Sequence, residues 1–137
     1  MSRNIQDSLP ERRLAQHAAR LAWSDVPAIT RDRFRMLVLD YVACLLSGLR
    51  SPLCDSIAGR ALRTGGRAEA SIVGVENRVP LAAAAFANAV AAHIYEADDV
   101  HDPGALHLSA VIFPVVFAAA EARGAAEDGW ERVGAAA

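Results

Sequence analysis

Residues 81–93, LAAAAFANAVAAH, limit the folds open to this chain more than any other stretch. Alanine is the best helix former, and Pro80 stands directly before the run, where proline suits the start of a helix. The run therefore predicts a helix that begins after Pro80, continues through His93 toward Ala97 and ends before Asp98. Because its side chains are so small, neighbouring helices can approach it closely, which favours a packed all-α domain.

Proline, glycine and capping residues predict four more helices. Ser8 and Glu11 have capping-box spacing at the start of the first helix, and Ser109 is the expected N-cap of the last. The expected spans are 8–23, 28–48, 51–64 and 109–124, and a sixth helix is expected to begin in the tail 128–137. The segment EASIVG, residues 69–74, is short enough for a strand or an extended connector. With 137 residues and 53% hydrophobic content, the chain has room for one domain of five to six helices.

The charge is unevenly distributed along the chain. Residues 1–67 hold 11 arginines against 6 acidic residues, and residues 68–137 hold 3 arginines against 10. No lysine is present, and the arginines are not interleaved with aromatic residues, so nucleic acid is not an expected partner. The basic half is better suited to pairing with the acidic half, with a neighbouring subunit or with a carboxylate-bearing ligand.

Three other classes of feature are absent from the sequence pattern. No uninterrupted apolar run approaches the ~18 residues that span a bilayer, so no membrane partner is expected. No basic and apolar signal pattern opens the chain, and we expect a cytoplasmic protein. The only cysteines, Cys44 and Cys54, are too few for a disulfide framework or a zinc site, and we interpret them as filler in the core or on the surface.

The most polar stretch is residues 93–109, HIYEADDVHDPGALHLS, which holds three of the four histidines and four acidic residues. It is predicted to form a helix end, a loop and the next helix start, an arrangement that can direct several side chains into one cleft. His93 and Glu96 share a helix face, and the loop allows His101 and His107 to approach them. The Ser109 hydroxyl and the free N–H groups of the last helix would suit a carboxylate ligand. Histidines beside carboxylates are typical of proton transfer, so the stretch is a candidate acid/base site.

Plainer interpretations of the same residues remain open. The stretch is about as well explained by a solvated loop. His93, Glu96 and the His101-Asp102 pair resemble part of the site of helical metal-dependent phosphohydrolases, but that pair alone is a weak signal and further ligands are not apparent. Because the candidate ligands are mostly flexible loop residues, we expect no tightly bound metal. Asn88 is either a ligand-binding amide or the source of an interhelical hydrogen bond.

Several segments in a fixed order resemble the N-terminal part of the MmgE/PrpD family, which includes 2-methylcitrate dehydratase and cis-aconitate decarboxylase. They are LVLDYVACLLSG, GGRAEASIVG, VPLAAAAFANAVAAH, the stretch from His93 through EADDVHDPGALHLS, and PVVFAAAEARGA. The resemblance implies a large helical domain followed by a smaller α/β lid domain, with the active site between them. It also implies chemistry without a cofactor and a homodimer.

By position, the resemblance implies that His107 is the active-site histidine and that Glu96 is the acid near the substrate. It places the family's DDxH core at Asp98, Asp99 and His101, and an asparagine of the preceding helix at Asn88. Asn88, together with His93 and Ser109, is expected to bind substrate.

Two positions depart from the family pattern. Leu108 replaces the proline that usually follows the histidine, and Glu96 is one methylene longer than the usual aspartate. Family members are also much longer, so residues 1–137 are expected to be part of one helical domain, with the rest of that domain and the lid supplied by missing sequence or by a partner chain.

The resulting expectation is a lyase acting on a small polycarboxylate, with His107 as acid/base, assisted by Glu96 and the Asp98-Asp99 carboxylates. Arginines and helix N-termini would bind the substrate carboxylates. Dehydration of a 2-methylcitrate-like acid is the first choice, and decarboxylation or epimerisation within the family is the second. A non-catalytic helical module that packs against a partner chain is the alternative, and the chain alone is expected to be inactive.

Overall fold

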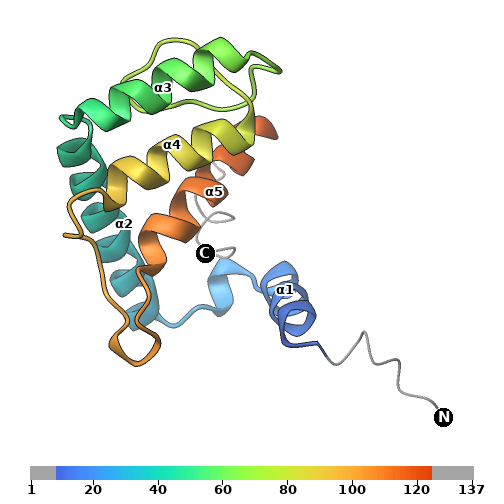
Figure 1. Ribbon diagram of the computed structural model, residues 1–137. Helices are drawn as coiled ribbons and strands as arrows, with labels where there is room; N and C mark the ends of the chain where they lie inside the picture. The colour runs from blue at the N-terminus through green and yellow to red at the C-terminus, as the bar shows by residue number, and fades with distance from the viewer. Residues whose placement is uncertain (1–8, 125–137) are drawn as a thin grey trace.

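The computed structural model describes residues 9–124, which form helices joined by loops (Figure 1). The α-helices are α1 (Pro10–Arg20), α2 (Ala28–Gly48), α3 (Pro52–Thr64), α4 (Leu81–His93) and α5 (Leu108–Ala122), with 3₁₀ turns at Trp23–Asp25 and Asp102–Gly104. Within this range there is no strand, only two isolated antiparallel bridges. The predicted all-α fold is confirmed, while the expected sixth helix lies outside the described residues.

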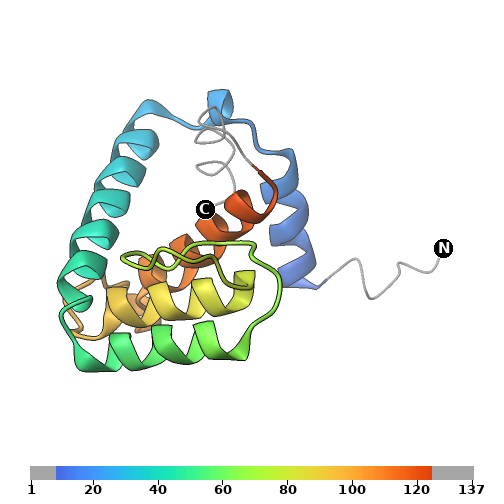
Figure 2. The same cartoon turned by 90° about the horizontal axis from the view of Figure 1, so that it is seen from above.

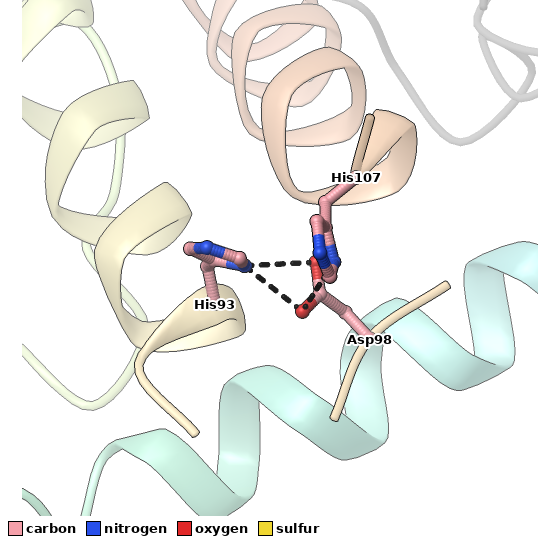
Figure 3. A group of neighbouring side chains, drawn as sticks. All are labelled: His93, Asp98 and His107. Carbon is pink, nitrogen blue, oxygen red and sulfur yellow. Dashed lines mark hydrogen bonds and ion pairs between the residues drawn. The ribbon is translucent and has the colours of Figure 1, made fainter. Parts of the chain in front are cut away.

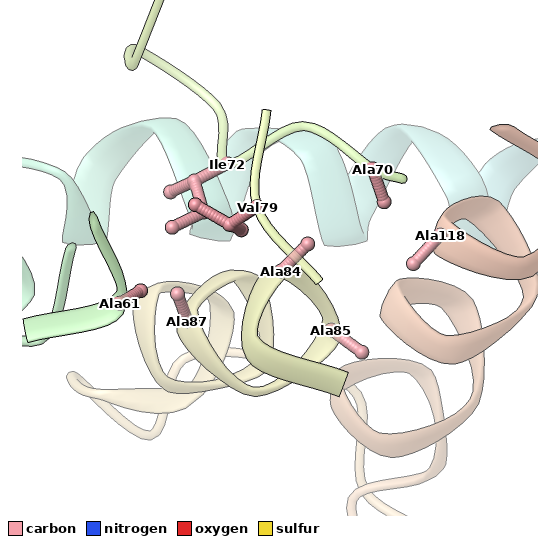
Figure 4. Packing of buried hydrophobic residues seen from close by; sticks show 8 residues of the cluster. All are labelled: Ala61, Ala70, Ile72, Val79, Ala84, Ala85, Ala87 and Ala118. Atoms are coloured by element: carbon pink, nitrogen blue, oxygen red, sulfur yellow. The ribbon is translucent and has the colours of Figure 1, made fainter. Parts of the chain in front are cut away.

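The alanine-rich helix α4 is the centre of the packing, in contact with α2, α3 and α5 (Figures 1 and 2). Its crossing with α2 is close enough that a Cβ added to Gly48 would lie 1.7 Å from the Ala91 carbonyl oxygen. Two apolar clusters form around α4. One is built mainly from alanines (Figure 4), and the other contains Tyr41, Leu45 and Phe113. The small residues of the sequence thus have the predicted consequence, which is direct contact between helix backbones.

The segment between α3 and α4 is extended and lies against the helices. Ala70 and Val79 form an antiparallel bridge, and both are almost fully buried. Asn88 of α4 holds the segment, because its side chain accepts a hydrogen bond from the Val73 N–H and donates one to the Ser71 carbonyl, each at 3.0 Å. The extended connector expected over residues 69–74 is therefore present.

Helices α2 and α3 begin and end close to the predicted residues, but α1 does not. Leu9 is its N-cap and provides no side-chain hydrogen bond, and Ser8 lies outside the described residues. The helix ends at Arg20 rather than continuing to Trp23, since Leu21 is already extended. No residue of α1 is buried, so no packing force extends it beyond this point.

The boundaries around the polar stretch also differ from those predicted. Helix α4 stops at His93 instead of Ala97, and Glu96 has a left-handed backbone with φ of 49°. Helix α5 begins at Leu108, so Ser109 is its second residue and not its N-cap. Pro114 lies inside α5 and is fully buried there.

Large apolar side chains remain exposed on α2 and α5 within residues 9–124. They include Ile29, Met36, Leu39, Val111 and Val115, each at least half exposed. No described helix is by itself long and apolar enough to cross a bilayer; α2 and α3 together satisfy length and composition but are bent by 92°.

Candidate acid/base site

The polar stretch brings two histidines and one aspartate together where α4 ends and α5 begins (Figure 3). His93 is the last residue of α4, and His107 is the residue directly before α5. The loop between them carries Asp98, whose side chain has no exposed surface. One buried carboxylate therefore lies between imidazoles from two helix ends.

The contacts of Asp98 with the two rings are not equivalent. His93 Nδ1 forms a hydrogen bond with Asp98 at 3.0 Å to Oδ1, with Oδ2 at 3.3 Å. His107 Nδ1 lies 3.3 Å from the same Oδ1 but lacks hydrogen-bond alignment, which leaves this buried nitrogen without a hydrogen-bond partner among the described residues. The ring centroids are 4.6 Å apart, in an edge-to-face arrangement.

The neighbouring aspartate has a different partner. Asp99 Oδ1 accepts a hydrogen bond from the Ser109 N–H at 3.0 Å, which satisfies one free donor of the α5 N-terminus. The predicted anion site at this helix end is thus partly occupied by a carboxylate of the chain itself. Ser109 is buried, with 3% of its surface exposed, so its expected role in substrate binding has no support in its accessibility.

The other predicted acid/base residues lie outside the two-histidine cluster. His101 is exposed, and its Nδ1 accepts a hydrogen bond from the Gly104 N–H at 3.1 Å, within a tight turn that is also held by a backbone bridge to Leu106. Glu96 is exposed as well. Among the described residues neither side chain forms a hydrogen bond or ion pair with Asp98, whose partners are His93 and His107, so His101 is placed as a turn residue and Glu96 as a surface acid. The metal-ligand set suggested by the His101-Asp102 pair is therefore not brought together in the described structure.

Asn88, the remaining predicted substrate ligand, is 8% exposed and uses its amide on the extended segment before α4. It lies five residues before His93, on a different side of the same helix. The structure favours the alternative in which this amide makes a packing contact, although its partners are on the connector and not on another helix.

Two residues of α2 near the site were not singled out from the sequence. Burial raises the pKa of the Cys44 thiol, and the carboxylates of Asp40, Asp98 and Asp99 raise it further. Asp40 Oδ2 is buried and has no hydrogen-bond partner among the described residues. A single acid within the apolar run LVLDYVACLL was the available signal.

The candidate site is rich in carboxylates that no arginine neutralises within the described residues. Between described residues, no arginine forms an ion pair with Asp40, Asp98 or Asp99. The cluster therefore has histidines for moving protons but no positive side chain for holding a polycarboxylate. Such a substrate would need cationic groups from outside this cluster.

Comparison with known proteins supports the family resemblance seen in the sequence. The family model for the MmgE/PrpD N-terminal domain matches residues 12–136. The cis-aconitate decarboxylase of Aspergillus terreus is 30% identical over 104 residues, which is 76% of this chain and 21% of that protein. The cis-aconitate decarboxylase-like protein oryM of Aspergillus oryzae is 33% identical over 121 residues, 85% of this chain and 25% of that protein. No solved structure matches the chain.

Proposed function

Because the chain belongs to the MmgE/PrpD family, we propose that it forms part of a lyase that removes carbon dioxide or water from a small polycarboxylate, with histidine as the acid/base and no cofactor. Decarboxylation of cis-aconitate is the first reaction to consider, because the matched relatives carry that name. Dehydration of 2-methylcitrate, the choice made from the sequence, stays a prediction for the same site, as does epimerisation.

The observation that carries this proposal is the position of Asp98 between His93 and His107. A carboxylate that faces Nδ1 favours the tautomer with its proton on that nitrogen, which leaves Nε2 as the base. The same carboxylate stabilises the imidazolium that forms when Nε2 takes a proton. Since 28% of the His107 side chain is exposed, its ring is accessible to a ligand while Asp98 is not.

Each reaction needs one proton to be moved by such a group. In decarboxylation, the bond between the carbon chain and the leaving carboxylate breaks, carbon dioxide departs, and the electron pair stays on the carbon chain. His107 in its protonated form would deliver a proton to that carbon. In dehydration, neutral His107 would remove a proton beside a carboxylate and then deliver that proton to the hydroxyl group, which leaves as water while the electron pair of the broken C–H bond forms the carbon–carbon double bond.

The rest of the active site is proposed to lie beyond this chain. The chain spans about a fifth to a quarter of the length of the relatives it matches. The described cluster lacks cationic groups, and the apolar faces of α2 and α5 are uncovered within residues 9–124. A lid domain and a second subunit, both expected from the resemblance, would supply charge, exclude water and cover these faces.

The proposal is tested by assaying the 137-residue chain and a full-length family protein that carries the same stretch. Both are incubated with cis-aconitate and with 2-methylcitrate, and carbon dioxide release and loss of substrate are measured. We expect turnover by the full-length protein only. A full-length protein inactive on both acids would contradict the lyase assignment and favour the helical interaction module. Turnover by the chain alone would contradict the inference that the site is incomplete.

A further inference from the structure

We propose that His93, Asp98 and His107 also form an exchangeable Zn²⁺ site, and that occupancy of this site blocks the acid/base function. The three side chains each offer one ligand atom, and these atoms all lie within 4.8 Å of one another. The inhibition rests on the proposed function, whereas the binding of the ion does not.

The spacing of the ligand atoms matches a tetrahedral ion. Zinc binds imidazole nitrogen and carboxylate oxygen at about 2.0–2.2 Å, so two ligands of a tetrahedral site are separated by roughly 3.3 Å. Asp98 Oδ1 lies 3.0 Å from His93 Nδ1 and 3.3 Å from His107 Nδ1. Two of the three ligand separations are therefore close to those that the ion requires.

A second observation points to the same ligand. His107 Nδ1 has almost no accessible surface and no hydrogen-bond partner among the described residues, although it is 3.3 Å from an oxygen of a fully buried carboxylate. Leaving a buried polar atom unpaired is destabilising. A cation between the nitrogen and the oxygen satisfies both, since each would direct a lone pair at it.

The surrounding charge and chemistry favour a divalent cation of intermediate softness. Asp99 directly follows Asp98 in the chain and adds negative charge, and no arginine pairs with it between described residues. Two imidazoles and one carboxylate suit zinc, and magnesium and calcium prefer oxygen ligands alone. Three protein ligands leave a fourth position open to water.

The site is expected to exchange its ion. The side chains of His93 and His107 are 43% and 28% exposed, so water reaches the outer part of both rings, while His107 Nδ1 itself is buried. This is consistent with the expectation that no metal is held tightly through dialysis against a chelator. A bound ion would occupy the nitrogens that face Asp98 and take up the carboxylate that stabilises the imidazolium. With Nδ1 bound to the ion, the proton of the neutral ring lies on Nε2, so His107 could no longer accept a proton there.

The binding is measured by titrating the metal-free 137-residue chain with Zn²⁺ in competition with a chromophoric chelator. We expect one ion per chain, and an affinity about tenfold or more weaker in His93→Ala, His107→Ala and Asp98→Asn. The chain offers matched controls, because His17→Ala and His101→Ala remove histidines outside the cluster and should change the affinity less than about twofold. Glutamine variants of both cluster histidines, checked by circular dichroism, separate loss of ligand from loss of fold.

The outcomes distinguish this site from the proposed function. Unchanged affinity in folded His93 and His107 variants would overturn the zinc site and leave the lyase proposal untouched. An equal loss of affinity in His101→Ala would overturn it too, because the ion would then bind the exposed turn. In the full-length protein, Zn²⁺ should lower turnover reversibly, with activity restored by chelator. Turnover unaffected by Zn²⁺ at saturation would contradict the inhibitory role.

Discussion

Asp99 accepts a hydrogen bond from the backbone N–H of Ser109 at 3.0 Å, and this contact ties the loop to the first turn of α5. The two residues are ten positions apart, with His107 between them at the helix boundary. The contact therefore closes the loop on the helix that carries the proposed acid/base residue. We interpret Asp99 as a positioning residue for His107.

Replacing Asp99 tests this capping contact. Asp99→Ala should lower the free energy of unfolding by about 1 kcal/mol, the usual cost of losing a side-chain cap, and Asp99→Asn should cost less because it keeps the acceptor oxygen. Urea unfolding followed by circular dichroism measures both. Asp102→Ala, in the exposed turn of the same loop, is the control and should change stability by less than about 0.5 kcal/mol. Equal effects at positions 99 and 102 would contradict the capping role.

Gly48 and Gly59 form a second matched pair for measuring how closely the helices pack. Gly48→Ala should destabilise the chain by about 1–3 kcal/mol or more, because its Cβ would collide with the Ala91 carbonyl. Gly59→Ala should stabilise it by about 0.5–1 kcal/mol, because the nearest atom to the new Cβ belongs to the flexible Arg63 side chain, at 3.2 Å. Thermal unfolding measures the stability of both variants. If Gly48→Ala keeps the stability of the unmodified chain, α2 and α4 cross at a greater distance than the structure shows.

Asn88 is expected to act through stability. Asn88→Ala removes the partners of the Val73 N–H and the Ser71 carbonyl and should cost about 1–3 kcal/mol. Asn77→Ala, in the exposed turn of the same segment, should have little effect. If Asn88→Ala unfolds at the same urea concentration as the unmodified chain, the hydrogen bonds of Asn88 do not stabilise the fold. Substrate binding would then be the better explanation for this residue.

The reactivity of the Cys44 thiol tests its proximity to Asp40, one turn earlier on α2. Burial raises the pKa of Cys44, and Asp40 is the first of the carboxylates that raise it further, whereas the pKa of Cys54 is raised by burial and then by Asp55. Asp40→Asn should therefore lower the Cys44 pKa and increase its thiolate fraction at pH 8. Alkylation by iodoacetamide, followed by peptide mass spectrometry, should show faster modification of Cys44 relative to Cys54. An unchanged ratio of the two rates would contradict the proximity of Asp40 to the thiol.

Much of the helical architecture could be predicted because local residues control it. Pro27, Ser51-Pro52 and Pro80 mark three helix starts, and the Ser51 side chain accepts a capping hydrogen bond from the Leu53 N–H. The end of α4 was misplaced because the left-handed backbone at Glu96 interrupts a run of good helix formers, and residue propensity carries no signal for it. The start of α5 depends on Asp99, whose contact spans the loop and is absent from local spacing.

The sequence predicts which stretch of the chain carries the candidate site, but not how the side chains of that stretch are arranged in space. All three members of the cluster were among the predicted residues, yet His101 and Glu96 were expected beside them and lie on the surface. The tight turn from His101 to Leu106 directs its own histidine outward and returns the chain so that His107 meets Asp98. Such a path depends on tertiary packing, which residue spacing alone does not specify.

The central claim is that His107 transfers a proton in the intact enzyme, and its most direct test is the catalytic constant of His107→Ala in a full-length family protein that carries this stretch. We predict a fall of roughly 10²-fold or more with an unchanged melting temperature, because the general acid/base is lost while the fold is retained. His101→Ala, in the exposed turn of the same loop, should keep near-normal turnover. A His107→Ala protein that turns over substrate at the unmodified rate, or that loses activity only by unfolding, would contradict the account.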